Sequence, residues 1–273
     1  MKTQTHILNQ HTSKPIILDI ELANEEDAPL IIFAHGFKGF KDWGHFNLLS
    51  KAFSEKGFHF LKFNFSCNGG TIENPIDFPD LEAFGNNTFS QEQEDLQIVI
   101  NWAFDYLQPS SVILMGHSRG GGATIIKAAN DNRISKLITL ASVASFDRWT
   151  KAVYEHWQRE GVIYIPNART NQQMPLYWSL AEDYFKNEKK LSIEQAAKSL
   201  FIPTLIIHGE ADEAVPYQEA LQLKDWIQNS ELLSIEEGTH TFGGKHPWPS
   251  KELPKPIVSI VSHALNFLCK PKI

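Results

Sequence analysis

Short, continuous apolar runs that stop at a glycine or a turn constrain this sequence more than any other feature. Leu30–Ala34, Val112–Met115 and Thr204–Ile207 each lead directly, or after one histidine, into a glycine. Strands without polar alternation are buried on both faces, as they are in a parallel sheet between two layers of helices. Four further runs have a similar apolar character: Ile16–Leu22, Phe58–Phe65, Leu137–Leu140 and Leu232–Ile235. The sequence therefore predicts an α/β fold with a mostly parallel central sheet and helices on both faces.

Segments of helical periodicity lie between these runs. In Gln91–Leu107 the apolar residues recur along one face, Ser90 is suited to cap the N-terminus, and Pro109 follows the end. Three shorter helical patterns cover residues 46–53, 123–129 and 257–268. A strand followed by a helix, repeated along the chain, predicts βαβ units.

Residues 146–202 interrupt this alternation. The segment has no apolar run followed by glycine, it is rich in Trp, Tyr and Phe, and its middle is rich in Pro, Asn and Gln. We expect a helical cap inserted into the main fold. Two interpretations remain open: a helical excursion that buries its aromatic residues against the core, or a lid that lines a substrate site.

The strongest chemical motif is Gly116-His117-Ser118-Arg119-Gly120, which has the form G-x-S-x-G. An apolar strand precedes it and a helix candidate follows it. A serine on such a tight strand-to-helix turn is held in a strained backbone with its hydroxyl exposed. The glycines two residues before and after let the strand and the helix approach each other closely. The context therefore favours a nucleophile over a purely structural glycine turn.

With His35-Gly36-Phe37 and the Gly-His-Ser-x-Gly-Gly motif, the sequence resembles the α/β-hydrolase superfamily, over most of its length. Within that superfamily it is similar to serine esterases related to cinnamoyl esterases and to dienelactone-hydrolase-like proteins. The resemblance implies an α/β-hydrolase fold and a catalytic triad in the chain order nucleophile, acid, histidine.

A serine hydroxyl needs a histidine base, and that histidine needs a carboxylate to orient it. Among the five histidines after Ser118, His240 lies in a glycine-containing loop after the last strand, and His246 is its rival in the same loop. The resemblance implies His240 as the base. It also implies Asp212 as the acid, in the loop after the strand at 204–207, with Asp147 as the alternative.

The oxyanion of an acyl-transfer intermediate needs two backbone N–H donors. The resemblance implies that they come from Arg119, directly after the nucleophile, and from Phe37, in the loop after Leu30–Ala34. We expect His35 to be a packed imidazole at the strand end. The Arg119 side chain is expected to form a surface ion pair rather than to bind substrate.

These residues predict a serine hydrolase that cleaves carboxylic esters through an acyl-enzyme intermediate. Three alternatives remain: a peptidase or amidase, an acyltransferase or C–C hydrolase using the same triad, and a ligand-binding protein without activity. Because the triad would draw on residues on both sides of the insertion, the sheet has to be continuous across it. We therefore expect residues 1–273 to form a single domain, with 146–202 as its cap or lid.

Composition excludes several other classes of protein. The 25 basic and 32 acidic residues give a net charge of −7, which lacks the basic footprint of a nucleic-acid binder. We expect a small-molecule ester as the partner, with no nucleic acid and no membrane, and the oligomeric state stays unassigned. The motifs of metal and nucleotide sites are missing, so no cofactor and no metal is expected. Two cysteines and an N-terminus without a long apolar stretch predict a cytoplasmic protein.

Overall fold

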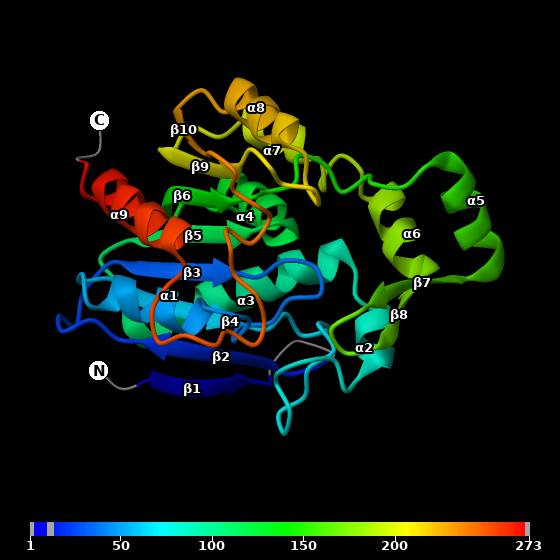
Figure 1. Cartoon of the computed structure of the whole chain (residues 1–273), viewed down its shortest axis with the longest axis horizontal. Coiled ribbons are helices and arrows are strands. Elements are labelled where there is room, and N and C mark those ends of the chain that lie inside the picture. Colours follow the sequence, from blue (N-terminus) through cyan, green and yellow to red (C-terminus); the bar gives the residue numbers. More distant parts are fainter. Residues whose placement is uncertain (1–2, 10–13, 271–273) are drawn as a thin grey trace.

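The computed structural model describes residues 3–9 and 14–270, so Met1 and Lys2 of the N-terminal stretch considered above lie outside the described residues. Within this part of the chain, the core is an eight-stranded sheet in the order β1-β2-β4-β3-β5-β6-β9-β10 (Figure 1). Its strands are β1 Thr3–Leu8, β2 Ile16–Glu21, β3 Leu30–Ala34, β4 His59–Phe63, β5 Val112–His117, β6 Ile134–Leu140, β9 Thr204–Gly209 and β10 Ser230–Ile235. Among the described residues of this eight-stranded sheet, only the pairs β1–β2 and β2–β4 are antiparallel, so the predicted mostly parallel sheet is confirmed.

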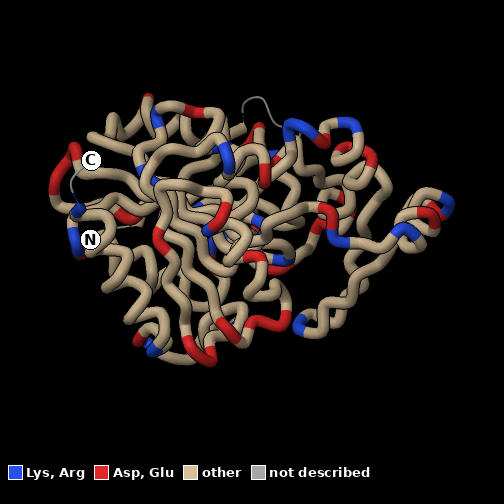
Figure 2. The backbone as a smooth tube through the Cα atoms, turned by 90° about the horizontal axis from the view of Figure 1, so that it is seen from above, with Lys and Arg blue, Asp and Glu red and all other residues tan. Residues whose placement is uncertain are grey.

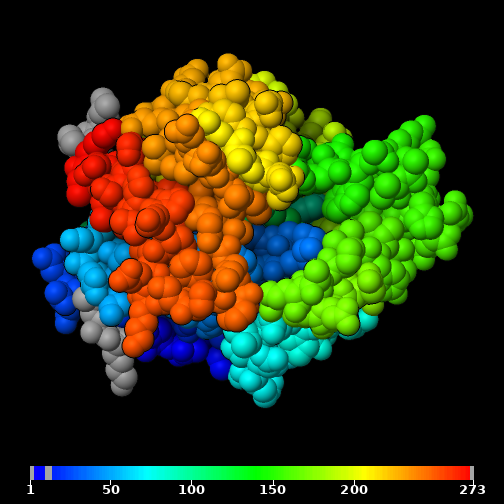
Figure 3. Space-filling view, viewed as in Figure 1, coloured from blue at the N-terminus to red at the C-terminus, as the bar shows by residue number. Residues whose placement is uncertain are grey.

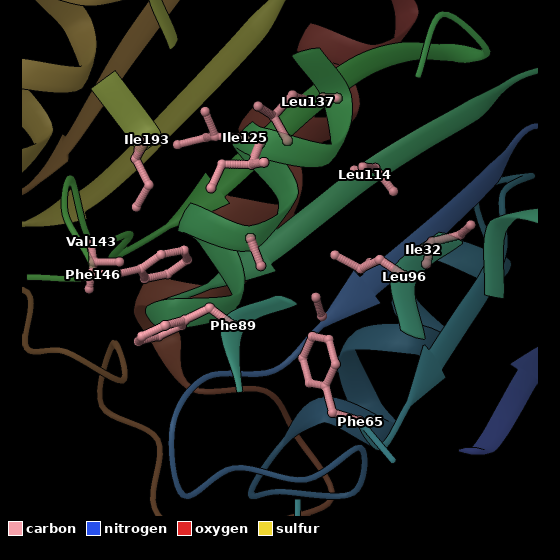
Figure 4. Packing of buried hydrophobic residues seen from close by; sticks show 14 of the residues in the cluster. Ile32, Phe65, Phe89, Leu96, Leu114, Ile125, Leu137, Val143, Phe146 and Ile193 are labelled. Carbon is pink, nitrogen blue, oxygen red and sulfur yellow. The ribbon is translucent and has the colours of Figure 1, made fainter. Parts of the chain in front are cut away.

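Helices cover both faces of the sheet because both faces are apolar. Along β3, Phe33 packs with α1 and α9, whereas Ile32 belongs to the cluster with α3, α4 and α8. Figure 4 shows Ile32, Leu96, Leu114 and Ile125 meeting in that second cluster. The helices are α1 Phe46–Ser54, α3 Phe89–Leu107, α4 Arg119–Asn130, α8 Tyr217–Trp226 and α9 Lys255–Cys269.

Strand β6 pairs directly with β9, so the sheet is continuous across the inserted segment, as expected. The insertion contains α5 Lys151–Glu160, β7 Val162–Asn167, β8 Gln172–Tyr177, α6 Trp178–Lys186 and α7 Ile193–Lys198. Figures 1 and 2 show α5, α6 and the β7–β8 hairpin projecting from one end of the molecule. Helix α7 instead packs against α4, and the short helix α2 (Leu81–Gly85) supports β8.

The inserted segment contains helices, as expected, and also an antiparallel hairpin of β7 and β8 that the sequence did not predict. Pro166 and Pro175 lie within these strands, and proline normally argues against a strand. A two-stranded ribbon tolerates it because each strand has a free edge where a missing N–H breaks no ladder bond. Ile163 and Ile165, apolar residues at alternate positions, were the sequence signal that could have indicated strand β7.

Two local expectations also need correction. Helix α3 begins at Phe89, and its N-cap is Thr88, not Ser90. The Thr88 hydroxyl accepts a hydrogen bond from the Gln91 N–H at 3.1 Å, which satisfies one of the free donors of the first turn. The edge strand β1 was not predicted.

Charges of both signs are interspersed along the backbone in Figure 2. No helix in the described ranges has the length and apolar character needed to cross a bilayer.

Candidate active site

Ser118 lies on the sharp turn between β5 and α4. Its backbone has φ 57° and ψ −122°, a region that costs a non-glycine residue about 1–3 kcal/mol. The turn is possible because Gly116 and Gly120 lack side chains: a Cβ at Gly116 would lie 2.4 Å from the Gly120 carbonyl oxygen. A Cβ at Gly120 would lie 2.4 Å from the carbonyl oxygens of Ala34 and His35. The strained geometry expected from the sequence is therefore present.

Ser118, His240 and Asp212 form a continuous chain of hydrogen bonds. His240 Nε2 lies 3.0 Å from Ser118 Oγ, and His240 Nδ1 lies 2.8 Å from Asp212 Oδ2. Asp212 follows β9 and His240 follows β10, so neighbouring parallel strands deliver both side chains to the same edge of the sheet. In this arrangement the serine can donate its proton to an imidazole that the carboxylate orients.

The Asp212 carboxylate is completely enclosed by donors. Oδ1 accepts the N–H groups of Ala214 and Val215, each at 2.9 Å. His208 Nε2, a group buried at the end of β9, lies 2.9 Å from the Val215 carbonyl oxygen and 3.4 Å from Asp212 Oδ2. Burial alone would raise the pKa of Asp212, but these donors and His240 hold that pKa below its ordinary value. Asp212 is thus an anion at neutral pH.

Two further histidines hold the loops around the site. His117 Nε2 donates to the His240 carbonyl oxygen at 2.9 Å, and desolvation lowers the pKa of His117 to about 3. His35 donates to the Gly36 carbonyl at 2.9 Å, and burial lowers its pKa to about 4. Both imidazoles are neutral at physiological pH, and His35 is the packed residue that the sequence predicted.

The backbone N–H groups of Phe37 and Arg119 flank Ser118. In the described part of the chain, neither N–H donates a hydrogen bond to another protein group. For Arg119 the reason is its place at the first position of α4, where a helix leaves its N–H without an internal acceptor. Both N–H groups are therefore available as hydrogen-bond donors.

The Arg119 side chain is not in the expected surface ion pair. Its guanidinium contacts Glu92 at 2.6 Å, and Glu92 is only 2% exposed. Asn87 donates a second hydrogen bond to Glu92 at 2.7 Å, and the guanidinium lies 4.8 Å from the centre of the Phe37 ring. This buried pair connects α3 to both residues whose amides flank Ser118.

Two pockets open beside Ser118. The larger, of about 490 Å³, lies under the cap and is mostly apolar; its lining includes Phe89, Val143, Phe146, Trp149 and Ile165. The smaller, of about 260 Å³, has Trp43, Phe46 and Asn167 in its walls. Phe37, Lys38, Ser118 and His240 line both. Figure 3 shows the hollow between the green cap and the orange and yellow C-terminal segments, with the blue segment of the thirties at its floor.

A third hollow of about 900 Å³ has no part in this site. It lies between α3, α4 and residues 187–199, most of its lining residues are of polar types, and it contains neither Ser118 nor His240. Size alone therefore does not locate the reactive centre.

The rival residues lie elsewhere. His246 accepts a hydrogen bond from the Gly44 N–H at 2.8 Å, and Asp147 accepts one from the Tyr154 hydroxyl at 2.8 Å. Sequence reasoning did not single out Lys38, Asn167 or Glu92, and no local motif marks them. In residues 3–9 and 14–270, no group of three or more His, Cys, Asp or Glu side chains is placed to hold a metal ion.

Known proteins resemble this chain in sequence and in fold. Residues 51–246 match the model of the prolyl oligopeptidase family. Quorum-quenching protein AidA of Acinetobacter baumannii is 28% identical over 42% of this chain and 36% of its own length. A bifunctional esterase/perhydrolase of Acinetobacter calcoaceticus is 22% identical over 78% of this chain and 86% of its own. For three curated relatives, AidA among them, this chain spans 36% to 53% of their length.

Among solved structures, Est1E from Butyrivibrio proteoclasticus superposes with a TM-score of 0.69. It is 20% identical, and the match covers 97% of this chain and 99% of Est1E. A second structure of Est1E, at 21% identity over 94% and 96% of the two chains, contains ferulic acid. At these identities the likeness shows the fold alone, which is the α/β-hydrolase fold.

Proposed function

This chain belongs to the prolyl oligopeptidase family, and from that premise we propose that it is a serine hydrolase that cleaves carboxylic esters through an acyl-enzyme intermediate. The observation that carries the proposal is the hydrogen-bonded chain from Ser118 through His240 to Asp212, at the junction of two pockets. The broader assignment, a hydrolase similar to esterases and lipases, follows from the family and from relatives such as the Acinetobacter calcoaceticus esterase.

In the proposed reaction Ser118 Oγ attacks the acyl carbon while His240 Nε2 accepts its proton. Asp212 holds the imidazole in the required tautomer and stabilises the imidazolium without taking the proton. His240 then protonates the leaving alcohol. A water molecule, activated by the same imidazole, releases the acid and restores Ser118.

The Phe37 and Arg119 amides are the proposed oxyanion donors. Removing one such donor typically lowers kcat ~100- to 1,000-fold, so their placement matters in addition to the triad. We further propose that residues 146–202 act as a cap on a single domain. The apolar lining that Trp149 and Ile165 contribute to the larger pocket suits an apolar or aromatic group of the ester.

An experiment with a matched control tests the assignment. We expect Ser118→Ala to keep its fold by circular dichroism but to lose aryl-ester hydrolysis and fluorophosphonate labelling. Ser135→Ala serves as control, because Ser135 lies at the start of β6, beside the end of β5 that is remote from Ser118, where its hydroxyl donates to the Val112 carbonyl. Undiminished labelling of Ser118→Ala would exclude Ser118 as the nucleophile.

Peptide-bond cleavage is the second candidate, because the matching family model is that of prolyl oligopeptidases. Comparison of kcat/KM for an aryl ester and the anilide of the same acid separates the two activities. The ester proposal expects the ester to be preferred. A higher value for the anilide would make the chain an amidase or peptidase with the same three residues.

A further inference from the structure

The two pockets at Ser118 have an unbalanced charge. No acidic side chain lines either one among the described residues, although the whole chain has a net charge of −7. Four cationic side chains line the two pockets: Lys38, Arg119, Arg148 and Arg169. Each of the three arginines is paired with a carboxylate outside the lining, Arg119 with Glu92, Arg148 with Glu219 and Arg169 with Asp77.

Lys38 differs from the arginines. In the described part of the chain its ammonium has no carboxylate partner, and its hydrogen bond goes to the Pro166 carbonyl oxygen at 3.2 Å. Partial burial lowers the pKa of Lys38. The residue also has φ 54°, a conformation in which glycine would be less strained. Backbone strain at a residue that lines the pockets with Ser118 indicates a functional role for the Lys38 side chain.

Asn167 is a further polar residue in the lining of the smaller pocket. It ends strand β7 on the cap side, it is 8% exposed, and it lines the pocket with Lys38. Its side-chain nitrogen is buried and has no acceptor in the described part of the chain. Buried donors are normally paired, and a ligand in the pocket would reach this enclosed nitrogen after a rotation of the Asn167 amide.

We propose that the smaller pocket binds a carboxylate on one arm of the substrate, through the Lys38 ammonium and the Asn167 amide. This inference rests on the proposed ester hydrolysis and names its substrate class: an ester with an apolar or aromatic arm in the larger pocket and a short carboxylate-bearing arm in the smaller one. A volume of about 260 Å³ limits that arm to a small group.

Two matched substrate pairs test the proposal. In the first, the acyl arm carries the charge: the naphthyl half-ester of adipic acid against its terminal carboxamide. In the second, the alcohol arm carries it: the naphthoate ester of glycolic acid against that of glycolamide. Carboxylate and carboxamide are nearly isosteric, so the ratio of their kcat/KM values isolates the charge.

We expect the carboxylate to be preferred by about tenfold or more in one pair, as is typical of a hydrogen bond to a charged group. The preference should weaken as ionic strength rises from about 0.01 M to about 1 M, because the Debye length falls from ~30 Å to ~3 Å. This measurement needs only the unmodified protein, so it stands even if a variant fails to fold.

Variants identify the residues. Lys38→Met should bring the ratio close to one, and Asn167→Asp should bring it below one by adding a negative charge to the pocket. Lys151→Met, the same substitution at an exposed position of α5, should leave the ratio as it is. If Lys38 served only to hold the cap hairpin, Lys38→Met would change both members of a pair alike and the ratio would persist.

A ratio near one in both pairs, or a ratio that survives Lys38→Met, overturns the carboxylate pocket. If neutral aryl esters are cleaved in a Ser118-dependent way but none of the four substrates is, the pocket is again wrong and the esterase proposal stands. If no ester at all is cleaved, the proposed function itself fails.

Discussion

Replacing Gly120 with alanine should pull apart the two amides proposed to bind the oxyanion. A Cβ at this position would lie 2.4 Å from the carbonyl oxygens of Ala34 and His35, whereas ordinary contact begins at 3.4 Å. Both obstacles are backbone atoms at the end of β3, so the start of α4 has to retreat by about 1 Å. Arg119 precedes Gly120 and moves with the helix, while Phe37 stays with β3.

A displacement of ~1 Å at a reacting centre typically lowers the rate about 100-fold, and a strained contact in a packed core costs about 1–3 kcal/mol. We therefore expect Gly120→Ala to lose about 100-fold in kcat/KM for an aryl ester. Its free energy of unfolding in urea should fall by about 1–3 kcal/mol.

Gly57→Ala is the matched control. Gly57 has φ 88° but no atom within 4 Å of a built Cβ, so alanine there strains the backbone without any clash. It should lose about 1 kcal/mol and keep its kcat/KM. Gly120→Ala with a kcat/KM within twofold of the unmodified protein would refute the reasoning.

Three further predictions concern the acid, a buried charge cluster and the cap. Asp212→Asn should keep the fold and lower kcat by roughly 10⁴, measured with an aryl ester, because an amide stabilises the wrong tautomer of His240. Asp19→Asn should cost up to about 3–5 kcal/mol at pH 7 in urea unfolding, because it removes one of the two carboxylates, Asp19 and Asp42, that both contact the buried Lys41 and Lys62 ammonium groups. Burial would raise the pKa of Asp19, but the two ammonium groups lower it to about 2. The stabilisation that Asp19 provides is therefore present above about pH 4 and is lost as the pH falls towards 2. The difference in free energy of unfolding between the variant and the unmodified protein should shrink over the same range. Trp157→Ala should cost about 3–5 kcal/mol and raise KM more than it lowers kcat, because the buried Trp157 supports Trp149 in the wall of the larger pocket; an unchanged KM would contradict this.

The elements that the sequence predicted best are those whose signals are local. Leu30–Ala34 is a strand with the expected bounds, and the run from Val112 continues to His117. Burial on both faces requires a continuous apolar run, and such a run is recognised in the sequence without knowledge of the neighbouring strands. The hairpin at β7 and β8 was missed for the converse reason: its prolines are acceptable only because each strand has a free edge, a fact of sheet pairing.

For the candidate site, the sequence by itself determined the strained Ser118 turn, since it depends on Gly116, Gly120 and the strand and helix that join there. It also supplied Asp212 and His240 as residues at strand ends, which a parallel sheet brings to one edge. Only the tertiary structure decided that Glu92 holds Arg119, and that Lys38 reaches the cap at Pro166, 128 residues further along the chain. The first contact depends on how α3 packs against α4, and the second on how the inserted segment packs over the loop after β3. No spacing in the sequence encodes either packing.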